Sequence, residues 1–120
     1  MVPEADRVRM RHMLEAGNSV MRFVAGRSRQ DLDADQMLVF AVVRGLEIIG
    51  EAANRVSVQR REACPEIPWP HIVGMRHRLV HAYFDVDLDR VWDTAVNSLP
   101  PLIAALERAL EGPAGDEKPA

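Results

Sequence analysis

The chain has 120 residues, a net charge of −3 and a hydrophobic content of 48%. This length suits one domain with one modest core, and the acidic balance disfavours a general nucleic-acid binder, because such domains usually carry a basic excess. No apolar run approaches the roughly 18 residues of a membrane span, no signal peptide is evident, and the lone Cys64 excludes an internal disulfide, so we expect a cytoplasmic protein.

The first half of the chain predicts two long helices. Apolar residues recur at helical spacing over 4–25, and the following Gly26 is typical of the turn that ends such a helix. A polar connector comes next, and Asp33 or Asp35 suits the N-cap of the second helix. Residues 35–56 form the longest apolar helical run. Because this run leaves little polar surface, it predicts a helix at the centre of a bundle.

A short helix, a rigid linker and a third long helix are expected after that run. Ser57 can cap a short helix over 58–63. Three prolines then occur within 65–70, and proline cannot sit inside a helix because it lacks the backbone N–H. One of these prolines suits the first turn of the next helix, which we expect over 69–84.

The last predicted helix covers 88–110, and Asp87 can cap it. The Pro-Pro pair at 100–101 should kink this helix. The polar tail at 112–120, rich in Pro and Gly, is expected to be disordered. The sequence therefore predicts a single domain over 1–111 with an all-α, up-and-down four-helix bundle, a short extra helix and a kinked last helix.

Two carboxylates, Glu47 and Glu51, lie four residues apart within the longest apolar run. Arg44 and Arg55 are at helical distance from them, so ion pairs along one helix are available. Paired surface carboxylates and a supporting role at a site are both compatible with this spacing. A buried carboxylate would need a partner, and Arg76 is a candidate.

The stretch 74–84 concentrates reactive side chains, with two arginines, two histidines and a tyrosine between Arg76 and Tyr83. Arg76, His81 and Tyr83 form the pattern Arg-x-x-x-x-His-x-Tyr. An arginine can neutralise a phosphate with a fork of donors, and a histidine can move a proton near neutral pH. Together they can cut a phosphodiester without a metal. The alternative is a helix whose polar face carries Arg and His by chance.

An ideal helix does not direct Arg76 and His81 at the same phosphate, because residues five apart diverge by roughly 140°. A helix that ends early, an arginine that reaches round, or a symmetric dimer would bring them together. A dimer would also supply two copies of His81, one as acid and one as base. Arg76 and Tyr83 would share one face of a continuous helix. A further ground for a homodimer is apolar surface that the small core cannot absorb, at Trp69, Ile72 and Val73.

Several blocks of the sequence, in order, resemble the HepT-like members of the HEPN superfamily, which are small all-helical toxins of prokaryotic toxin–antitoxin pairs. The blocks cover most of the chain between 5 and 110 and are found at 46–53, 65–69, 74–84 and 87–92. The family most often has an asparagine after the motif arginine, and this chain has His77 there. The resemblance implies a bundle of HEPN type.

The resemblance also implies a metal-independent endoribonuclease toxin of a type VII-like system, without a cofactor. Arg76 would hold the scissile phosphate, and His81 would act as general acid or base and leave a 2′,3′-cyclic phosphate. His77, Glu47 and Glu51 would support these groups. The implied partner is an MntA-type nucleotidyltransferase antitoxin that transfers AMP to Tyr83 and silences the enzyme. The homodimer predicted from the residues could form a larger complex when this antitoxin is bound.

Two other classes of function remain open from the residues alone. His77 and His81 are four apart, as in metal-binding helices, and Glu47 or Glu51 could complete such a site. The chain could instead be a non-catalytic helical module that binds a nucleotide or a partner protein, because fold does not determine function.

Overall fold

The computed structural model describes residues 3–82 and 85–117. This part of the chain is built almost entirely of helices, with one short hairpin of two strands. In chain order the elements are α1 (Glu4–Val24), α2 (Asp31–Ala34), α3 (Gln36–Asn54), α4 (Val58–Ala63), α5 (Trp69–Val73), α6 (Met75–Leu79), β1 (Val80–Ala82), β2 (Asp85–Val86), α7 (Leu88–Asp93), the π-helical turn η1 (Thr94–Ser98) and α8 (Leu99–Glu117).

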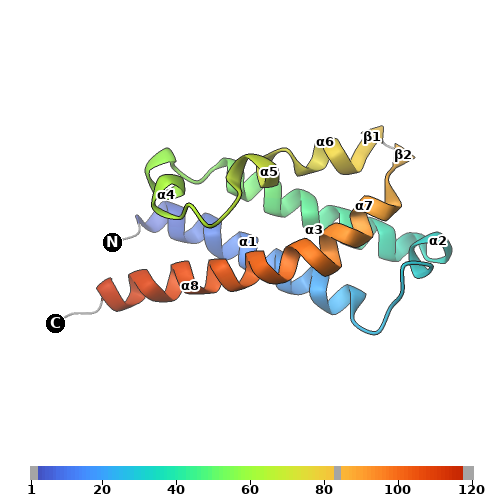
Figure 1. Cartoon of the computed structure of the whole chain (residues 1–120), viewed down its shortest axis with the longest axis horizontal. Helices are drawn as coiled ribbons and strands as arrows, with labels where there is room; N and C mark the ends of the chain where they lie inside the picture. The colour runs from blue at the N-terminus through green and yellow to red at the C-terminus, as the bar shows by residue number, and fades with distance from the viewer. Residues whose placement is uncertain (1–2, 83–84, 118–120) are drawn as a thin grey trace.

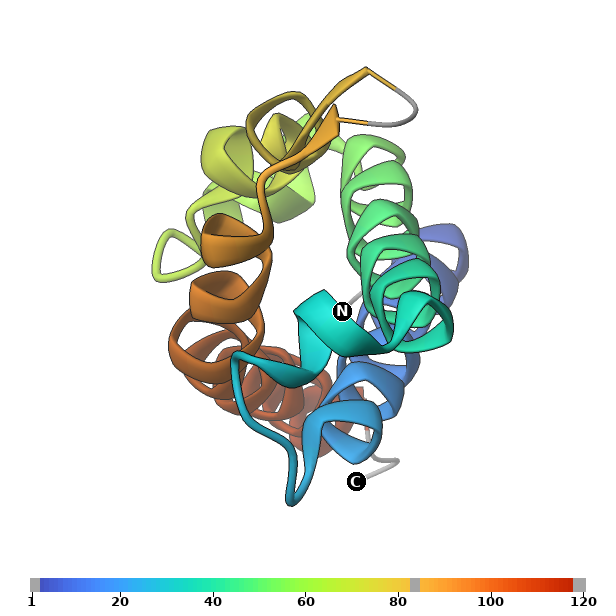
Figure 2. The same ribbon diagram turned by 90° about the vertical axis from the view of Figure 1, so that its right-hand side faces the viewer.

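These elements form the predicted up-and-down bundle, whose four sides are α1, α3, the pair α5–α6, and the run α7–η1–α8 (Figures 1 and 2). Helix α1 packs against α3 and α8, and α3 also packs against α5 and α6. The bundle is elongated, with extents of 53 × 27 × 19 Å. Within the described residues, no helix has the length and apolar character that a membrane span requires.

The core is a single cluster of buried apolar side chains contributed by all four sides of the bundle. Its largest members with almost no exposed surface include Met10, Met13, Leu46, Ile49, Leu99 and Leu106. Helices α1 and α3 approach closely at Gly45, where a Cβ atom would lie only 2.4 Å from Cγ2 of Val20. A side chain at this position would therefore require Val20 or one of the helices to move.

The N-caps predicted from the sequence are confirmed at three helices. The side chains of Asp35, Ser57 and Asp87 each accept a hydrogen bond from the backbone N–H three residues ahead, at 3.1 Å in every case. Ser57 also bonds to the buried carboxylate of Asp6, through its N–H at 2.9 Å and its hydroxyl at 2.6 Å. Because a buried carboxylate requires donors, this contact joins the start of α4 to α1.

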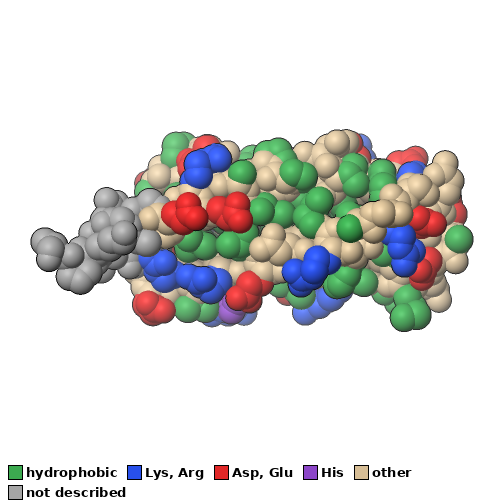
Figure 3. All heavy atoms as spheres, turned by 90° about the horizontal axis from the view of Figure 1, so that it is seen from below, with side chains coloured by type: hydrophobic (Ala, Val, Ile, Leu, Met, Phe, Trp, Pro, Cys, Tyr) green, Lys and Arg blue, Asp and Glu red, His purple; other side chains and the backbone are tan. Residues whose placement is uncertain are grey.

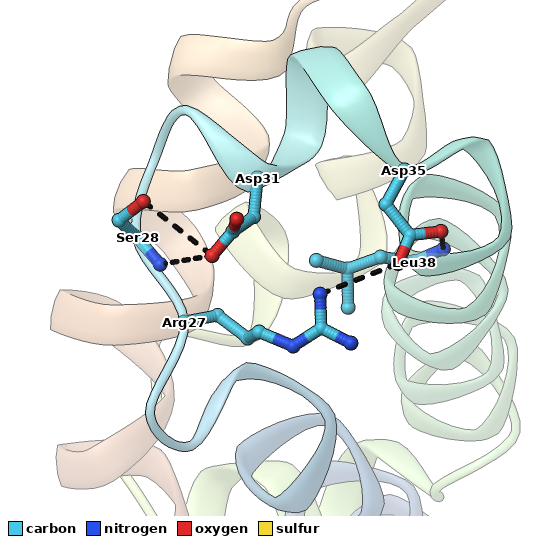
Figure 4. Close-up of polar contacts among 5 residues, drawn as sticks. All are labelled: Arg27, Ser28, Asp31, Asp35 and Leu38. Carbon is cyan, nitrogen blue, oxygen red and sulfur yellow. Dashed lines mark hydrogen bonds and ion pairs between the residues drawn. The ribbon is translucent and has the colours of Figure 1, made fainter.

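Two aspartates hold the connector between α1 and α3 (Figure 4). Gly26 ends the α1 region with a positive φ of 73°, and Asp31 then accepts the backbone N–H of Ser28 at 2.7 Å. Asp35 caps α3 and also pairs with Arg27 at 3.2 Å. The N–H of Leu38, and then Arg27, hold the pKa of Asp35 below its usual value.

The structure corrects the single helix predicted over 69–84. That segment is divided by a glycine into α5 and α6, and α6 ends at Leu79. Val80 has extended dihedral angles and pairs with Val86 in the antiparallel hairpin of β1 and β2. The carbonyl of Leu79 accepts the backbone N–H of Asp87 at 2.8 Å. These non-local backbone bonds override the local preference for helix, which is only a weak prior.

The last helix is irregular where its prolines require it. The π-helical turn η1 ends directly before α8, whose second and third residues are the prolines at 100–101. A proline inside a helix lacks an N–H, and its ring clashes with the carbonyl four residues earlier. Those carbonyls belong to η1, where the wider turn changes the bonding pattern. The predicted interruption is therefore present, in the turn before the prolines.

The end of the chain differs from the prediction. Helix α8 was expected to end near residue 110 but continues to Glu117. Once a helix is nucleated, each further residue can add a backbone hydrogen bond at little cost. Residues 118–120 lie outside the described part of the chain.

The lowered pKa of Asp35 predicts a specific loss of stability in acid. A carboxylate whose pKa is depressed by folding stabilises the protein above its unfolded pKa of about 3.9, and this contribution disappears as the pH falls through the folded pKa. Asp35→Asn keeps a capping side chain but cannot ionise. We therefore expect the free energy of unfolding of Asp35→Asn, measured by urea denaturation, to depend less steeply on pH below about 5 than that of the wild type.

The exposed Asp85 on β2 provides the matched control, since Asp85→Asn removes a carboxylate that caps no helix. Below about pH 5, the free energy of unfolding of Asp85→Asn should depend on pH as steeply as that of the wild type. Equal slopes for the wild type and Asp35→Asn would contradict the assigned contacts.

Candidate functional site

The segment that carries the reactive residues is anchored by its buried side chains. Trp69 and Ile72 of α5 are buried, and the indole N–H of Trp69 donates to the carbonyl of Cys64 at 3.1 Å. Burial raises the pKa of the Cys64 thiol, which makes it a poor nucleophile and a structural residue. The apolar surface that we predicted at Trp69 and Ile72 for a second copy is therefore already used by the core of the monomer.

A glycine of α3 determines how close this segment lies to the bundle. A Cβ atom at Gly50 would lie 3.1 Å from the carbonyl oxygen of Ile72 and 3.8 Å from that of Val73. The backbone of α5 therefore packs directly on α3 at this point. Helix α6, which follows at once, is held beside the same helix by the buried Met75 and Leu79.

Arg76 extends from α6 to α3 and pairs with Glu47. Its Nε lies 2.7 Å from Oε2 of Glu47, and the side chains are 54% and 20% exposed, respectively. Glu47 is also 3.7 Å from Arg44, which in turn lies 3.6 Å from Glu51. The partnership predicted for Arg76 is thus present. Such surface pairs add only about 0–1 kcal/mol of stability, so their main effect is to orient the arginine.

Arg76 lines one wall of a surface groove of about 270 Å³ between α3, α6 and the hairpin. The other lining residues are Val39, Phe40, Val43, Arg44, Glu47, Val80 and Val86. Two guanidinium groups and one carboxylate thus face an otherwise apolar groove. An arginine that is half exposed and already oriented can bind a phosphate with its planar donors.

The two motif histidines lie in different elements. His77 is exposed on α6, whereas the backbone of His81 belongs to β1. We considered three ways in which Arg76 and His81 could be brought together, and one of them was a helix that ends early. The structure contains such an early end, at Leu79. The helical face expected to be common to Arg76 and Tyr83 is not formed, because α6 ends at Leu79. Tyr83 itself lies outside the described residues.

The metal-binding alternative required His77 and His81 on one helical face. The helix ends between them, so that arrangement is absent. Among the residues that the structure describes, no three His, Cys, Asp or Glu side chains are grouped as metal ligands. Glu47 and Glu51 pair with arginines of their own neighbourhood instead.

One side of α3 is exposed, in contrast to the central position predicted for this helix. We expected this helix to lie centrally with little free surface, yet Met37 is 81% exposed and Phe40 is 64% exposed. Both lie on the side of the helix that carries Arg44, Glu47 and Glu51. The spacing of these three charged residues was the available signal, since continuing it backwards by helical steps reaches Phe40 and Met37.

The face seen from below the bundle does not offer a similar concentration of positive charge. On it, arginine side chains alternate with acidic and hydrophobic ones (Figure 3). This mixture of both signs is typical of a solvated protein surface. The groove at Arg76 is therefore a more specific candidate for an anionic ligand than the general charge of the surface.

Known proteins are similar in sequence to this chain over most of its length. The family model described as "Ribonuclease HepT-like" matches residues 13–109. A protein from Caldanaerobacter subterraneus subsp. tengcongensis named "Putative RNase" is 35% identical over 85% of this chain and 91% of its own length. A "Probable ribonuclease HepT" from Thermococcus cleftensis is 40% identical over 66% of this chain and 72% of its own length.

A further relative named "Putative RNase", from Methanocaldococcus jannaschii, is 32% identical over 88% of each chain. No solved protein structure matches the chain significantly. The family match covers the motif segment, the glycine contact on α3 and helix α7 with its cap. The chain therefore belongs to the HepT-like ribonuclease family of the HEPN superfamily.

Proposed function

We propose that this protein is a cytoplasmic, metal-independent endoribonuclease, the toxin of a type VII-like toxin–antitoxin pair. The observation that carries the proposal is the exposed Arg76, oriented by Glu47 at 2.7 Å on the wall of a groove. A fixed guanidinium at such a place suits a phosphate that gains charge during cleavage. Membership of a ribonuclease family, together with relatives named as ribonucleases, supports RNA as the substrate.

Cleavage would proceed through the 2′-hydroxyl of the ribose. His81 would take the proton of this hydroxyl while its oxygen attacks the adjacent phosphorus. The bond to the 5′-oxygen of the next nucleotide would break, and that oxygen would receive a proton from an acid. The products are a 2′,3′-cyclic phosphate and a 5′-hydroxyl. DNA lacks the attacking group and should not be cut.

Removal of either proposed catalytic side chain should nearly abolish cleavage without unfolding the protein. For His81→Ala we expect a loss of about 10²–10⁴-fold, the usual contribution of general acid–base catalysis. For Arg76→Ala we expect about 10²–10³-fold, as for other lost groups that stabilise the charge of a transition state. The measurement is the cleavage rate of a labelled single-stranded RNA in the presence of EDTA, with circular dichroism to verify folding.

Exposed residues of the same types provide matched controls. His12→Ala on α1 and Arg108→Ala on α8 should cleave at the wild-type rate. Unchanged cleavage by His81→Ala would exclude its proposed role. Loss of wild-type activity in EDTA would favour metal-dependent chemistry.

We also propose a homodimer that brings two motif segments together. The reaction needs both a base and an acid, and a shared cleft would supply one from each copy of His81. The exposed His77 is the alternative acid within a single chain. Since Trp69 and Ile72 are buried in the monomer, the support for the dimer comes from this chemical requirement.

Mixing wild-type and His81→Ala chains would reveal a shared cleft. If one copy of His81 is the base and the other the acid, a heterodimer of these two chains lacks one of the two groups, so subunit exchange with an excess of His81→Ala should lower the activity of the wild type. Light scattering at micromolar concentration should give twice the monomer mass. A fully active monomer would show that no second copy is needed.

We propose finally that Tyr83 is the regulatory site, to which an MntA-type nucleotidyltransferase antitoxin attaches AMP. Tyr83 follows His81 by two residues and Arg76 by seven. The phosphate of an attached AMP would add negative charge near the group that should bind the substrate phosphate, and the adenosine would occupy space in the RNA path.

Tyr83→Phe should therefore cleave RNA at close to the wild-type rate but escape silencing by the antitoxin. Co-expression with the cognate nucleotidyltransferase, followed by intact mass spectrometry, should show one or more added AMP groups on the wild type. The same treatment of Tyr83→Phe should show none. Neutralisation of the wild type without a change in mass would mean that the partner acts by binding alone.

A further inference from the structure

Phe40 is an aromatic side chain left on the surface beside the arginine of the site. It is 64% exposed and forms part of two grooves. One is the groove of about 270 Å³ that contains Arg76. The other, of about 550 Å³, is bounded by α2, the first turn of α3, β2 and the start of α7. The grooves have Val39, Phe40 and Val86 in common, so Phe40 stands at the junction between them.

Phe40 and the charged end of the groove lie along the same side of α3. Arg44 and Glu47 follow Phe40 by four and seven residues, which places all three on one helical face. The distance along the helix axis from Phe40 to Glu47 is about 10 Å at 1.5 Å per residue. Arg76 is bonded to Glu47. An exposed ring and an exposed guanidinium therefore line the same groove, at positions set about two helical turns apart along α3.

We propose that Phe40 stacks against an unpaired base of the RNA next to the phosphate that Arg76 binds. This inference rests on the proposed ribonuclease function and adds a substrate class to it, namely RNA with unpaired nucleotides. Proteins that bind single strands combine cationic groups for the backbone with aromatic rings for the bases. Both faces of a base inside a duplex are already stacked, so a duplex cannot use Phe40 in this way.

The composition of the groove favours a nucleotide over a second copy of this chain. The groove with Arg76 contains two guanidinium groups, of Arg44 and Arg76, and one carboxylate, of Glu47. Its lining thus carries a net positive charge within a chain of net charge −3. An anion with an attached apolar ring complements both the charge and the valine-lined wall. The surface of another copy would on average be acidic.

Fluorescent RNA in a non-cleaving background tests the inference. The probe is a short single-stranded RNA containing 2-aminopurine, whose fluorescence falls when the base stacks, and the background is His81→Ala. We expect Phe40→Leu to weaken binding about 5- to 100-fold, which is the range for one lost stacking contact, and to abolish the quenching. Phe40→Trp should retain both binding and quenching, because it keeps an aromatic face.

Phe23 of α1 offers a matched control, because it is also partly exposed, at 39%. Phe23→Leu should bind like the parent protein, and a fully paired version of the RNA should bind without sensitivity to Phe40→Leu. Arg76→Ala in the same background reports separately on the phosphate contact. All variants are compared at one salt concentration, because binding through phosphates depends strongly on salt.

The possible outcomes separate the two proposals. If RNA binding depends on Arg76 but Phe40→Leu binds with the same affinity and quenching, the stacking inference is wrong and the ribonuclease proposal is unaffected. If no variant binds RNA and the wild type cleaves none, the proposed function fails and the stacking fails with it. If Phe40→Leu converts a dimer to a monomer in light scattering, the ring belongs to a subunit interface and the inference is overturned.

Discussion

The contact between the backbones of α3 and α5 at Gly50 is the constraint on which the candidate site depends. A carbonyl oxygen of α5 lies 3.1 Å from the point that a Cβ atom would occupy at this position, which is a tight contact. Because α6 follows α5 after a single residue, this distance also determines how far α6 stands from α3. At this separation Arg76 pairs with Glu47 at 2.7 Å. A backbone contact without any reactive group thus positions the reactive one.

The pair of Arg76 and Glu47 contributes differently to the protein than the buried contact of Asp6 with Ser57. Asp6 is withdrawn from water, so its donors prevent the large cost of an unsatisfied buried charge. Arg76 is half exposed, and its ion pair is screened by solvent. The first contact therefore serves stability and the second serves orientation. An arginine held in this way can bind a second anion without leaving its position, since the guanidinium has N–H donors on more than one edge.

The end of α6 places Arg76 and His81 in different elements. On a continuous helix, Arg76 and His81 would diverge by roughly 140°. In the structure the chain becomes extended after Leu79, and the hairpin returns it to α7. The motif thus spans a junction between a helix and a strand. Side-chain direction repeats about every 3.6 residues in a helix and every two residues in a strand.

The sequence by itself determined the all-α class, the long helices α1 and α3, and the caps at Asp35, Ser57 and Asp87, as well as the family to which the chain belongs. The helices and caps depend on side chains within three or four residues of one another, so local periodicity and capping preferences are sufficient to predict them. The family is recognised from several blocks of sequence in order.

Only the tertiary structure decided where α6 ends, which side of α3 remains exposed and how Arg76 meets Glu47. The end of α6 depends on backbone bonds to β2 and to Asp87. The exposure of Phe40 depends on which neighbours cover α3, and its apolar character alone pointed to the core. The exposure of Phe40 and the pair of Arg76 with Glu47 depend on segments distant in sequence, and the end of α6 depends on backbone bonds across a hairpin. Both kinds of contact outweigh local propensity, because propensity differences amount to only a fraction of a kcal/mol per residue, about 0–0.7 for ordinary residues.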